Sequence, residues 1–182
     1  MFWMRILDRV RGSVLWLVAS DKPVQNNLRK EAAARGVDPG RLIFAERVSY
    51  AEYLSRLPAA DLFLDTAPYN AGATASDALW AGLPVLTCEC DVFVGRMGAS
   101  LLSAIGLPEL VTATPQAYEE LAIELATSSG KLRAIKDKLA SNRLTTPLFD
   151  TKRFIRHIEA AYTEAYRRYQ AGLQPDHIQV PQ

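Results

Sequence analysis

Residues 61–87 read Asp-Leu-Phe-Leu-Asp-Thr-Ala-Pro-Tyr-Asn-Ala-Gly-Ala-Thr-Ala-Ser-Asp-Ala-Leu-Trp-Ala-Gly-Leu-Pro-Val-Leu-Thr. This pattern predicts a buried strand over 62–64, a loop of small residues over 67–73, a helix that opens near Thr74 and a second strand over 84–87. In an α/β fold such a loop lies at the carboxyl end of the sheet. The free amides and the positive dipole end of the following helix attract phosphate groups there.

Four residues in this stretch suit the binding of a nucleotide. Asn70 can supply a turn with positive φ, Gly72 allows a close backbone approach, and Thr74 offers a hydroxyl at the helix N-cap. Asp77 falls one turn into the helix, where its carboxylate can accept hydrogen bonds from vicinal hydroxyls such as those of a ribose. We therefore expect a diphosphate at the helix start and a sugar beside Asp77.

A plainer interpretation of the same residues stays open. Thr74 or Ser76 can be simply a helix cap, and Asp77 can simply complement the helix dipole. Capped strand-to-helix turns are common, so composition and spacing alone favour this plainer interpretation.

The flanking sequence continues the alternation of strands and helices. The continuous apolar run 14–18 predicts a central strand buried on both faces, and residues 42–44 and 110–112 predict further strands. Gly82 and Gly106 stop helices, and Thr114 begins one. The expected helices cover residues 2–11, 24–35, 50–57, 74–81, 93–105, 131–143 and 151–170, with a further one that starts at 114 and includes 125.

These elements predict an α/β fold, with a three-layer, Rossmann-like parallel sheet and a long C-terminal helix. We expect one domain over residues 1–170 and a loosely tethered tail over 171–182. Asp150 or Thr151 is expected to cap the final helix, which carries an apolar face of Phe154, Ile158, Ala161 and Tyr162. No capping residue precedes the first helix, which suggests that the first strand of the domain is missing from the chain.

Composition and charge limit the classes of function that the chain can have. The 182 residues are 49% hydrophobic and 23% charged, as in a globular domain, and the formal net charge is +1. A net charge this small gives no sign of a basic surface that would bind nucleic acid or an anionic membrane. The N-terminus has no secretory apolar region, and no apolar run reaches about 18 residues. We therefore expect a cytoplasmic protein.

Several reactive side chains offer little support for catalysis. Cys88 and Cys90 lack the further thiols or histidines that a zinc site needs, so we interpret them as free thiols and expect no metal. His157 and His177 lie far from the predicted strand ends, and neither is expected to act as a general base. Arg96, in the first turn of a helix, can serve a solvated face or a nucleotide phosphate.

The motifs together resemble the C-terminal lobe of the TPR-linked O-GlcNAc transferases, the SPINDLY-like group of GT-B glycosyltransferases. The similarity covers almost the whole chain. It is carried by Asp65-Thr66, Pro68-Tyr69-Asn70, Gly72, Thr74, the run Asp77–Gly82 and the run Pro84–Thr87, with support from Val14–Leu17, Arg41–Phe44, Thr146–Lys152 and Gln174–His177.

The resemblance implies a lobe that binds UDP or UDP-GlcNAc as substrate, without a cofactor or metal, in an inverting enzyme that moves GlcNAc to Ser/Thr hydroxyls of a protein acceptor. It implies that Asp77 holds the ribose, while Thr74 and the amides near Gly72 and Ala73 hold the diphosphate. The remaining contacts implied are Val48 and Tyr50 with uracil, Tyr53 stacked on the base, and Arg56, which matches a family arginine. From the residues alone, Tyr50 and Tyr53 are more often packing groups.

The chain departs from the family pattern in two ways. Ala71-Gly72-Ala73-Thr74 replaces Gly-His-Thr-Thr, and Tyr50 and Tyr53 replace a lysine and a histidine. The TPR array, the N-terminal catalytic lobe and a lysine that neutralises the leaving group are not found in the sequence, which shows no 34-residue repeat. We therefore expect negligible transfer by this chain alone, and the sequence identifies no particular residue as catalytic. The alternative is a non-catalytic nucleotide-binding module, or an orphaned remnant of such an enzyme.

Overall fold

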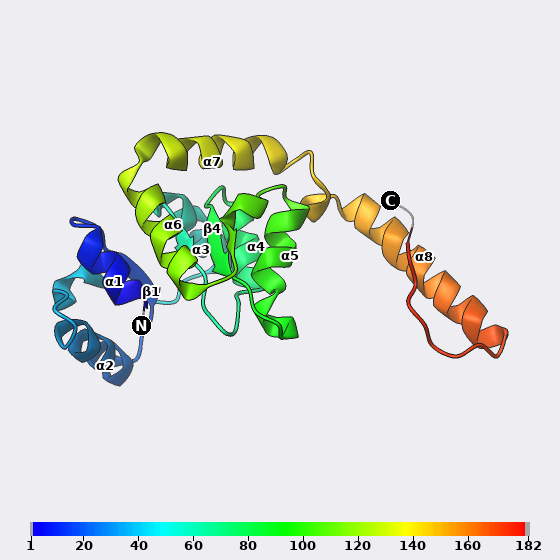
Figure 1. Cartoon of the computed structure of the whole chain (residues 1–182), viewed down its shortest axis with the longest axis horizontal. Helices are drawn as coiled ribbons and strands as arrows, with labels where there is room; N and C mark the ends of the chain where they lie inside the picture. The colour runs from blue at the N-terminus through cyan, green and yellow to red at the C-terminus, as the bar shows by residue number, and fades with distance from the viewer. Residues whose placement is uncertain (1, 181–182) are drawn as a thin grey trace.

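The computed structural model describes residues 2–180 and shows an α/β body from which one long helix projects (Figure 1). All strand pairs are parallel. The strands are β1 (Leu15–Val18), β2 (Leu42–Ala45), β3 (Phe63–Leu64), β4 (Val85–Cys88) and β5 (Val111–Thr112). The helices are α1 (Phe2–Arg9), α2 (Lys22–Ala33), α3 (Tyr50–Arg56), α4 (Ala73–Trp80), α5 (Met97–Ala104), α6 (Pro115–Thr127), α7 (Ser129–Asn142) and α8 (Thr151–Gln170).

The predicted strand, loop, helix and strand over residues 61–87 are confirmed as β3, α4 and β4. Phe63 pairs with Val85 and Leu64 with Leu86, so the two strands lie side by side in parallel. Helix α4 ends at Gly82, whose φ of 85° suits glycine. The amide of Leu83 donates to the carbonyl of Ala78 at 2.8 Å, and that of Gly82 donates to Leu79 at 3.1 Å. This double closure is a Schellman motif, which turns the chain directly into β4.

Strand β4 is the centre of the larger sheet. It lies between β3 and β5, and all four of its residues are buried. Helices α4 and α5 pack apolar residues against the sheet, and α7 covers this cluster. Its fully buried members are Ala75, Ala78, Leu79, Leu83, Val85, Leu102, Ile105, Leu107, Leu110, Leu125 and Leu139. The site loop between β3 and α4 is therefore attached at both ends to the best-packed part of the molecule.

The sheet is divided, which contradicts one prediction. Strand β1 pairs with β2 in register from Leu15 and Leu42, but no other strand of residues 2–180 adds to it. Val14 and Val18 are 58% and 61% exposed, so the prediction of a central strand buried on both faces was wrong. The continuous apolar run indicates that both faces of the strand are apolar, but it does not indicate whether another part of the chain covers them.

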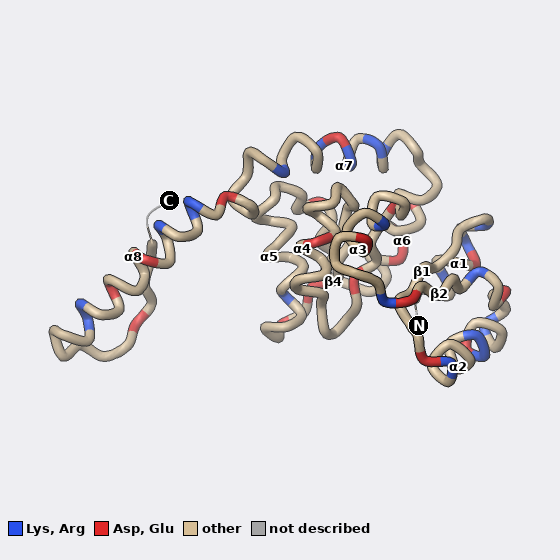
Figure 2. Tube along the Cα trace, turned by 180° about the vertical axis from the view of Figure 1, so that it is seen from behind, with Lys and Arg blue, Asp and Glu red and all other residues tan. Residues whose placement is uncertain are grey.

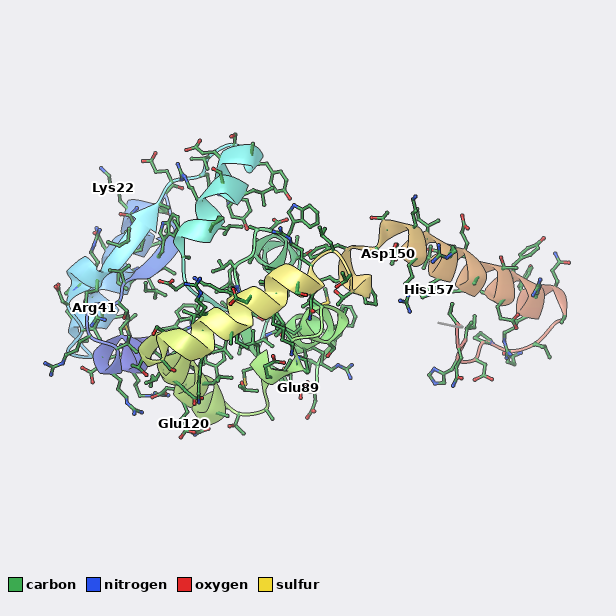
Figure 3. The ribbon with its side chains drawn as sticks, turned by 90° about the horizontal axis from the view of Figure 1, so that it is seen from above. Lys22, Arg41, Glu89, Glu120, Asp150 and His157 are labelled. Atoms are coloured by element: carbon green, nitrogen blue, oxygen red, sulfur yellow. The ribbon has the colours of Figure 1, made fainter. Side chains whose placement is uncertain are left out.

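Helix α1 connects the two sheets. Met4 and Leu7 pack into the cluster beneath β2, whereas Ile6 and Val10 pack with residues of β4 and α6. Arg41, marked in Figure 3, fixes the end of this helix, because its guanidinium donates to the carbonyls of Val10 and Ser13, each at 2.8 Å. Both sheets therefore have α1 against them, although they share no strand pair.

Helix α8 projects away from the body (Figure 1). Asp150 caps it as predicted, since its carboxylate accepts from the amide of Arg153 at 2.9 Å. Phe154 and Tyr162 on its apolar face are 63% and 68% exposed. The described part of the tail turns back along α8, where Arg168 donates to the carbonyl of Gln174 at 2.9 Å.

Charged residues of both signs are mixed over the surface, as the blue and red segments of Figure 2 show. Among the described residues no helix combines the length and apolar character needed to cross a membrane. His157 lies on the projecting helix, far from the sheets (Figure 3), which agrees with the prediction that it is remote from the strand ends.

Candidate functional site

The loop from Thr66 to Gly72 leaves β3 and leads into α4, but its conformation differs from the prediction. No non-glycine residue among 2–180 has a positive φ, and Gly72 itself has a φ of −98°. Asn70 therefore does not form the expected turn. Instead it is buried, and its side-chain amide donates to the carbonyl of Thr66 at 2.8 Å. Asn70 holds the loop together from inside.

The start of α4 is also built differently from the prediction. The helix begins at Ala73 with Gly72 as N-cap, so Thr74 is the second residue of the helix and does not cap it. Its exposed hydroxyl makes no hydrogen bond within the described residues. The first intrahelical bond runs from the amide of Ser76 to the carbonyl of Gly72 at 3.0 Å. A glycine cap has no side-chain oxygen, so the amides of residues 73–75 lack an acceptor within residues 2–180.

These amides can receive an anion. Ala73 and Thr74 are exposed, so solvent reaches the helix start. The positive end of the helix dipole points to the same place. Met97 of α5 lies beside the loop, with its terminal methyl 3.5 Å from the position that a Cβ on Gly72 would occupy. The site is an open helix start at the carboxyl end of β3, where α/β folds bind phosphate groups.

Asp77 lies one turn further along α4 and already has one partner. The Tyr50 hydroxyl of α3 donates to its Oδ1 at 2.7 Å. This hydrogen bond is the main cause that raises the pKa of Tyr50, because removal of the proton would break it. The ring of Tyr53 lies next to that of Tyr50, with 6.1 Å between the ring centroids and an interplanar angle of 35°. Asp77, Tyr50 and Tyr53 thus form one group from two helices.

The other predicted contacts are less closely associated. Val48 is half-buried in the loop between β2 and α3. Arg56 pairs with Glu52 on its own helix, and no hydrogen bond joins it to Asp77 or α4 among the described residues. Arg96 is the exposed N-cap residue of α5 and has no ion-pair partner within residues 2–180. The structure brings Tyr50, Tyr53 and Asp77 together, but it does not link Val48 or Arg56 to them.

Sequence reasoning gave no role to Asp65, the residue that follows β3. Only 1% of it is exposed, and its carboxylate accepts from the amides of Thr66 and Ala71 at 2.8 and 2.7 Å and from the hydroxyl of Thr87 at 2.7 Å. Burial raises the pKa of Asp65, and these three hydrogen bonds partly oppose the rise. The sequence signal that could have found it is a carboxylate placed directly at the end of a buried strand.

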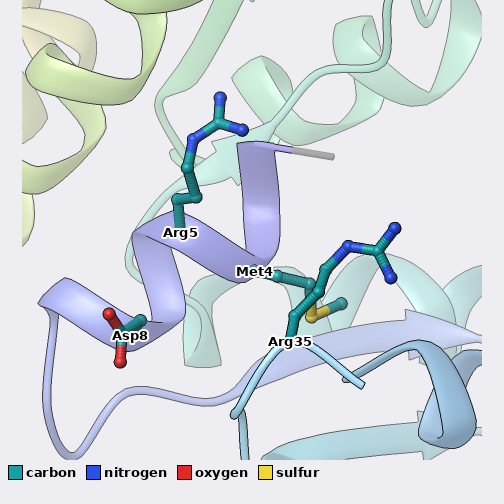
Figure 4. A pocket seen from close by; sticks show the side chains of 4 residues that line it. All are labelled: Met4, Arg5, Asp8 and Arg35. Carbon is teal, nitrogen blue, oxygen red and sulfur yellow. The ribbon is translucent and has the colours of Figure 1, made fainter. Parts of the chain in front are cut away.

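Two hollows of the surface lie away from α4. One, of about 280 Å³, is lined by Met4, Arg5, Asp8 and Arg35 (Figure 4). Arg5 pairs with Glu119, and Arg35, just beyond the end of α2, pairs with Glu31 of that helix. Because these cations are already paired and no group converges on the hollow, we place the site at α4. A second hollow lies between the start of β3 and α7 and also contains no residue of α4.

In the described part of the chain, no group of three or more histidine, cysteine or acidic side chains lies close enough together to bind a metal ion. Cys88 is buried and Cys90 half-buried, and both are free thiols, as predicted. Burial raises the pKa of the Cys88 thiol, which makes its reactive thiolate scarcer.

Comparison with protein families identifies the chain's relatives. The model of glycosyl transferase family 41 matches residues 1–158. A protein of Arabidopsis thaliana described as a probable UDP-N-acetylglucosamine–peptide N-acetylglucosaminyltransferase SEC is 37% identical over 179 residues, which cover 98% of this chain and 18% of that protein. The UDP-N-acetylglucosamine–peptide N-acetylglucosaminyltransferase of Caenorhabditis elegans is 34% identical, with 97% of this chain and 15% of that protein covered.

A solved structure supports the same relationship. A K341M mutant of the O-GlcNAc transferase of Thermobaculum terrenum superposes with a TM-score of 0.87 and 31% sequence identity. The match covers 91% of this chain and 32% of that one. The chain therefore spans less than a fifth of the two curated relatives and about a third of the solved structure.

Proposed function

Since the chain belongs to glycosyl transferase family 41, we propose that it is the UDP-sugar-binding part of an inverting enzyme that transfers GlcNAc from UDP-GlcNAc to Ser/Thr hydroxyls of proteins. Two curated relatives and the solved relative bear names that describe such transferases. The observation that carries the proposal is the open, glycine-capped start of α4 beside Asp77, at the carboxyl end of β3.

The diphosphate would bind at the start of α4. The amides of residues 73–75 point out of the helix and can donate to phosphate oxygens, and the Thr74 hydroxyl is exposed beside them. No metal is required in this arrangement, because the helix dipole and the amides supply the positive potential. Arg96, exposed at the start of the adjacent α5, can add a charge.

The nucleoside would bind between α4 and α3. Asp77 can accept hydrogen bonds from the ribose hydroxyls with the oxygen that Tyr50 leaves unused. Tyr50 is 63% exposed, so its ring can contact the uracil, with Val48 on the loop before it. Tyr53 offers the face on which the base would stack. Arg56 lies one helical turn beyond Tyr53 on α3.

The divided sheet supports a site that residues outside this chain complete. β1 is hydrogen-bonded on one edge to β2, and β3 on one edge to β4, while α1 packs against both sheets. A parallel strand preceding α1 would lie beside β1 by the crossover rule, on its unoccupied edge. The resulting order, with this strand between β1 and β3, is the 3-2-1-4-5-6 order of dinucleotide-binding folds, in which the ligand lies at the junction of the first and fourth strands.

We therefore propose that the first strand, the preceding catalytic lobe and a TPR array belong to the complete enzyme. The site at β3 and α4 supplies one wall of the donor cleft, and the groups that assist departure of the diphosphate and bind the acceptor lie on the other. This chain alone should show negligible transfer, because nothing closes the cleft or excludes water from it.

The alternative is a non-catalytic nucleotide-binding module or an orphaned remnant. One observation favours it: the Tyr50 hydroxyl already donates to Oδ1 of Asp77, an oxygen that a ribose would otherwise use. A labelled-sugar transfer assay with and without a family N-terminal lobe separates the two. Transfer that depends on the added lobe supports the enzyme, whereas UDP binding without transfer under both conditions supports the module.

Calorimetric titration of the chain with UDP tests the donor site. We expect saturable heat from the wild type and about ten- to hundredfold weaker binding by Asp77→Ala, because hydrogen bonds to a charged acceptor are worth about 1.5–3 kcal/mol and 1.4 kcal/mol is tenfold. Asp137→Ala, which removes an exposed helical carboxylate from α7, should bind as the wild type does. Absence of heat at millimolar UDP, or equal binding by the Asp77 variant, contradicts the proposal.

A further inference from the structure

Asp65 closes the loop that leads to the helix start. One carboxylate oxygen, Oδ1, accepts from the amide of Thr66 at 2.8 Å and from that of Ala71 at 2.7 Å. These amides stand at the two ends of the loop, so a single oxygen ties its first residue to its last. Inside the loop, the Asn70 side chain donates to the carbonyl of Thr66 at 2.8 Å, which closes it a second time.

The second oxygen of this carboxylate bonds to the neighbouring strand and takes no part in the loop bonds. This oxygen, Oδ2, accepts from the hydroxyl of Thr87, a fully buried residue of β4, at 2.7 Å. The carbonyl of Thr87 in turn accepts from the hydroxyl of Thr112 on β5 at 2.9 Å. The Tyr118 hydroxyl of α6 donates to the backbone carbonyl of Asp65 at 3.0 Å. Asp65 is thus held by two strands and a helix before it holds the loop.

Helix α5 seals the carboxylate from water. Gly98, the second residue of α5, lies so close that a Cβ there would be 2.6 Å from Oδ2 of Asp65 and 2.5 Å from the Thr87 hydroxyl. Backbone therefore covers the pair directly. A buried carboxylate costs free energy unless its oxygens are hydrogen-bonded, and here all three donors come from groups that the fold fixes.

The helix start depends on this attachment because its cap is glycine. A serine or aspartate N-cap would anchor the chain by its own side chain, but Gly72 has none. The bond from Ala71 to Asp65 is the last one made by the loop before the cap. Without it, residues 66–71 are no longer held away from the helix start, where Ala73 and Thr74 are exposed while the loop is folded back.

We propose that Asp65 is a positioning residue for the donor site, which keeps the anion-binding start of α4 open by holding the loop 66–71 in its folded conformation. It contacts no substrate in this role. The inference rests on the proposed function for its consequence in UDP binding, but its effect on the loop is a separate, measurable claim.

Three variants of the chain test it. Asp65→Asn keeps an oxygen that can accept from both loop amides and an amide group that can donate to the Thr87 hydroxyl. Asp65→Ala removes all three hydrogen bonds. Thr87→Val is the matched control, because it removes the buried partner of Oδ2 and destabilises the core while leaving the two loop bonds in place.

The measurements are UDP affinity by calorimetry and amide hydrogen exchange at residues 66–75, with thermal melting to confirm that each variant is folded. For Asp65→Ala we expect at least about tenfold weaker UDP binding and faster exchange at the Ala71 amide, since the loss of one or two loop bonds is worth about a factor of ten. Asp65→Asn and Thr87→Val should bind UDP within about threefold of the wild type, although Thr87→Val should melt lower.

Wild-type affinity and protection of the Ala71 amide in Asp65→Ala would overturn the inference. The inference would also be overturned if Thr87→Val weakened UDP binding as much as Asp65→Ala does. The loss of affinity would then follow the stability of the core and not the conformation of the loop. Failure of the wild type to bind UDP would contradict the proposed function instead, and the exchange rate at Ala71 would still decide the role of Asp65 on the loop.

Discussion

Replacement of Gly98 by alanine should destabilise the protein, although alanine is ordinarily the better residue within a helix. Gly98 is the second residue of α5, and its φ lies outside the positive region that favours glycine. The backbone therefore tolerates alanine, and helix propensity favours the change by up to about 1 kcal/mol. The opposing effect is steric and arises from the buried pair beneath the helix.

The size of the effect follows from the contacts. The new methyl carbon would stand 2.5 Å from the Thr87 hydroxyl, 2.6 Å from Oδ2 of Asp65 and 2.8 Å from Cβ of Thr87, all well inside van der Waals contact. Overpacking of a buried site typically costs about 1–3 kcal/mol, so after the helix gain we expect a net loss of about 1 kcal/mol and up to about 2 kcal/mol. This loss corresponds to a melting temperature lower by about 2–8 °C for a domain of this size.

Gly130→Ala is the matched control for this change. Gly130 is likewise the second residue of its helix, α7, but a Cβ there would meet no atom within 4 Å. The control should therefore leave stability unchanged or raise it by up to about 1 kcal/mol. Urea unfolding followed by circular dichroism measures both variants. Equal or greater stability of Gly98→Ala relative to the wild type would refute the close approach of α5 to Asp65.

Two further predictions concern the core and pH. Leu79→Ala should lower the free energy of unfolding by about 2–5 kcal/mol, because Leu79 is a fully buried residue of α4. Leu144→Ala, at a residue 75% exposed, should change it little. Similar urea midpoints for the two variants would contradict this packing. Burial is the main cause that raises the pKa of Asp65 in the folded state. The protonated carboxyl therefore stabilises the folded state at pH below the usual aspartate pKa. This contribution to the free energy of unfolding is lost as the pH rises through the raised pKa. The wild type should therefore lose stability relative to Asp65→Asn as pH increases across the window just above the usual aspartate pKa, and unfolding curves that shift in parallel over this window would contradict the shift.

Local patterns were sufficient to predict most elements of the fold. The Gly82 stop, the Thr114 cap and the Asp150 cap are all present, the last two with side-chain oxygens 3.1 and 2.9 Å from the amides that they accept from. Each depends on residues a few positions apart, which is why sequence spacing reveals them.

The errors share a different origin. Thr74 was predicted to cap α4, but the cap is Gly72, two residues earlier, and the loop before it is held by Asp65, which also bonds to Thr87 on another strand. The strand over 14–18 was predicted to be central, yet β1 has a neighbour on one edge only among the described residues. The UDP contacts at Val48, Tyr50, Tyr53, Arg56 and the α4 start remain predictions.

Periodicity, helix-stop glycines and capping residues dictated that this chain forms parallel strands alternating with helices, because these signals arise from backbone conformations and from burial within short windows. It is the tertiary structure alone that brings Tyr50 to Asp77 and buries Asp65 against Thr87. It also leaves β1 and β3 each with one edge that no strand of residues 2–180 covers. Such contacts join residues more than 20 positions apart, and their geometry depends on how whole elements pack, which no local pattern of residues encodes.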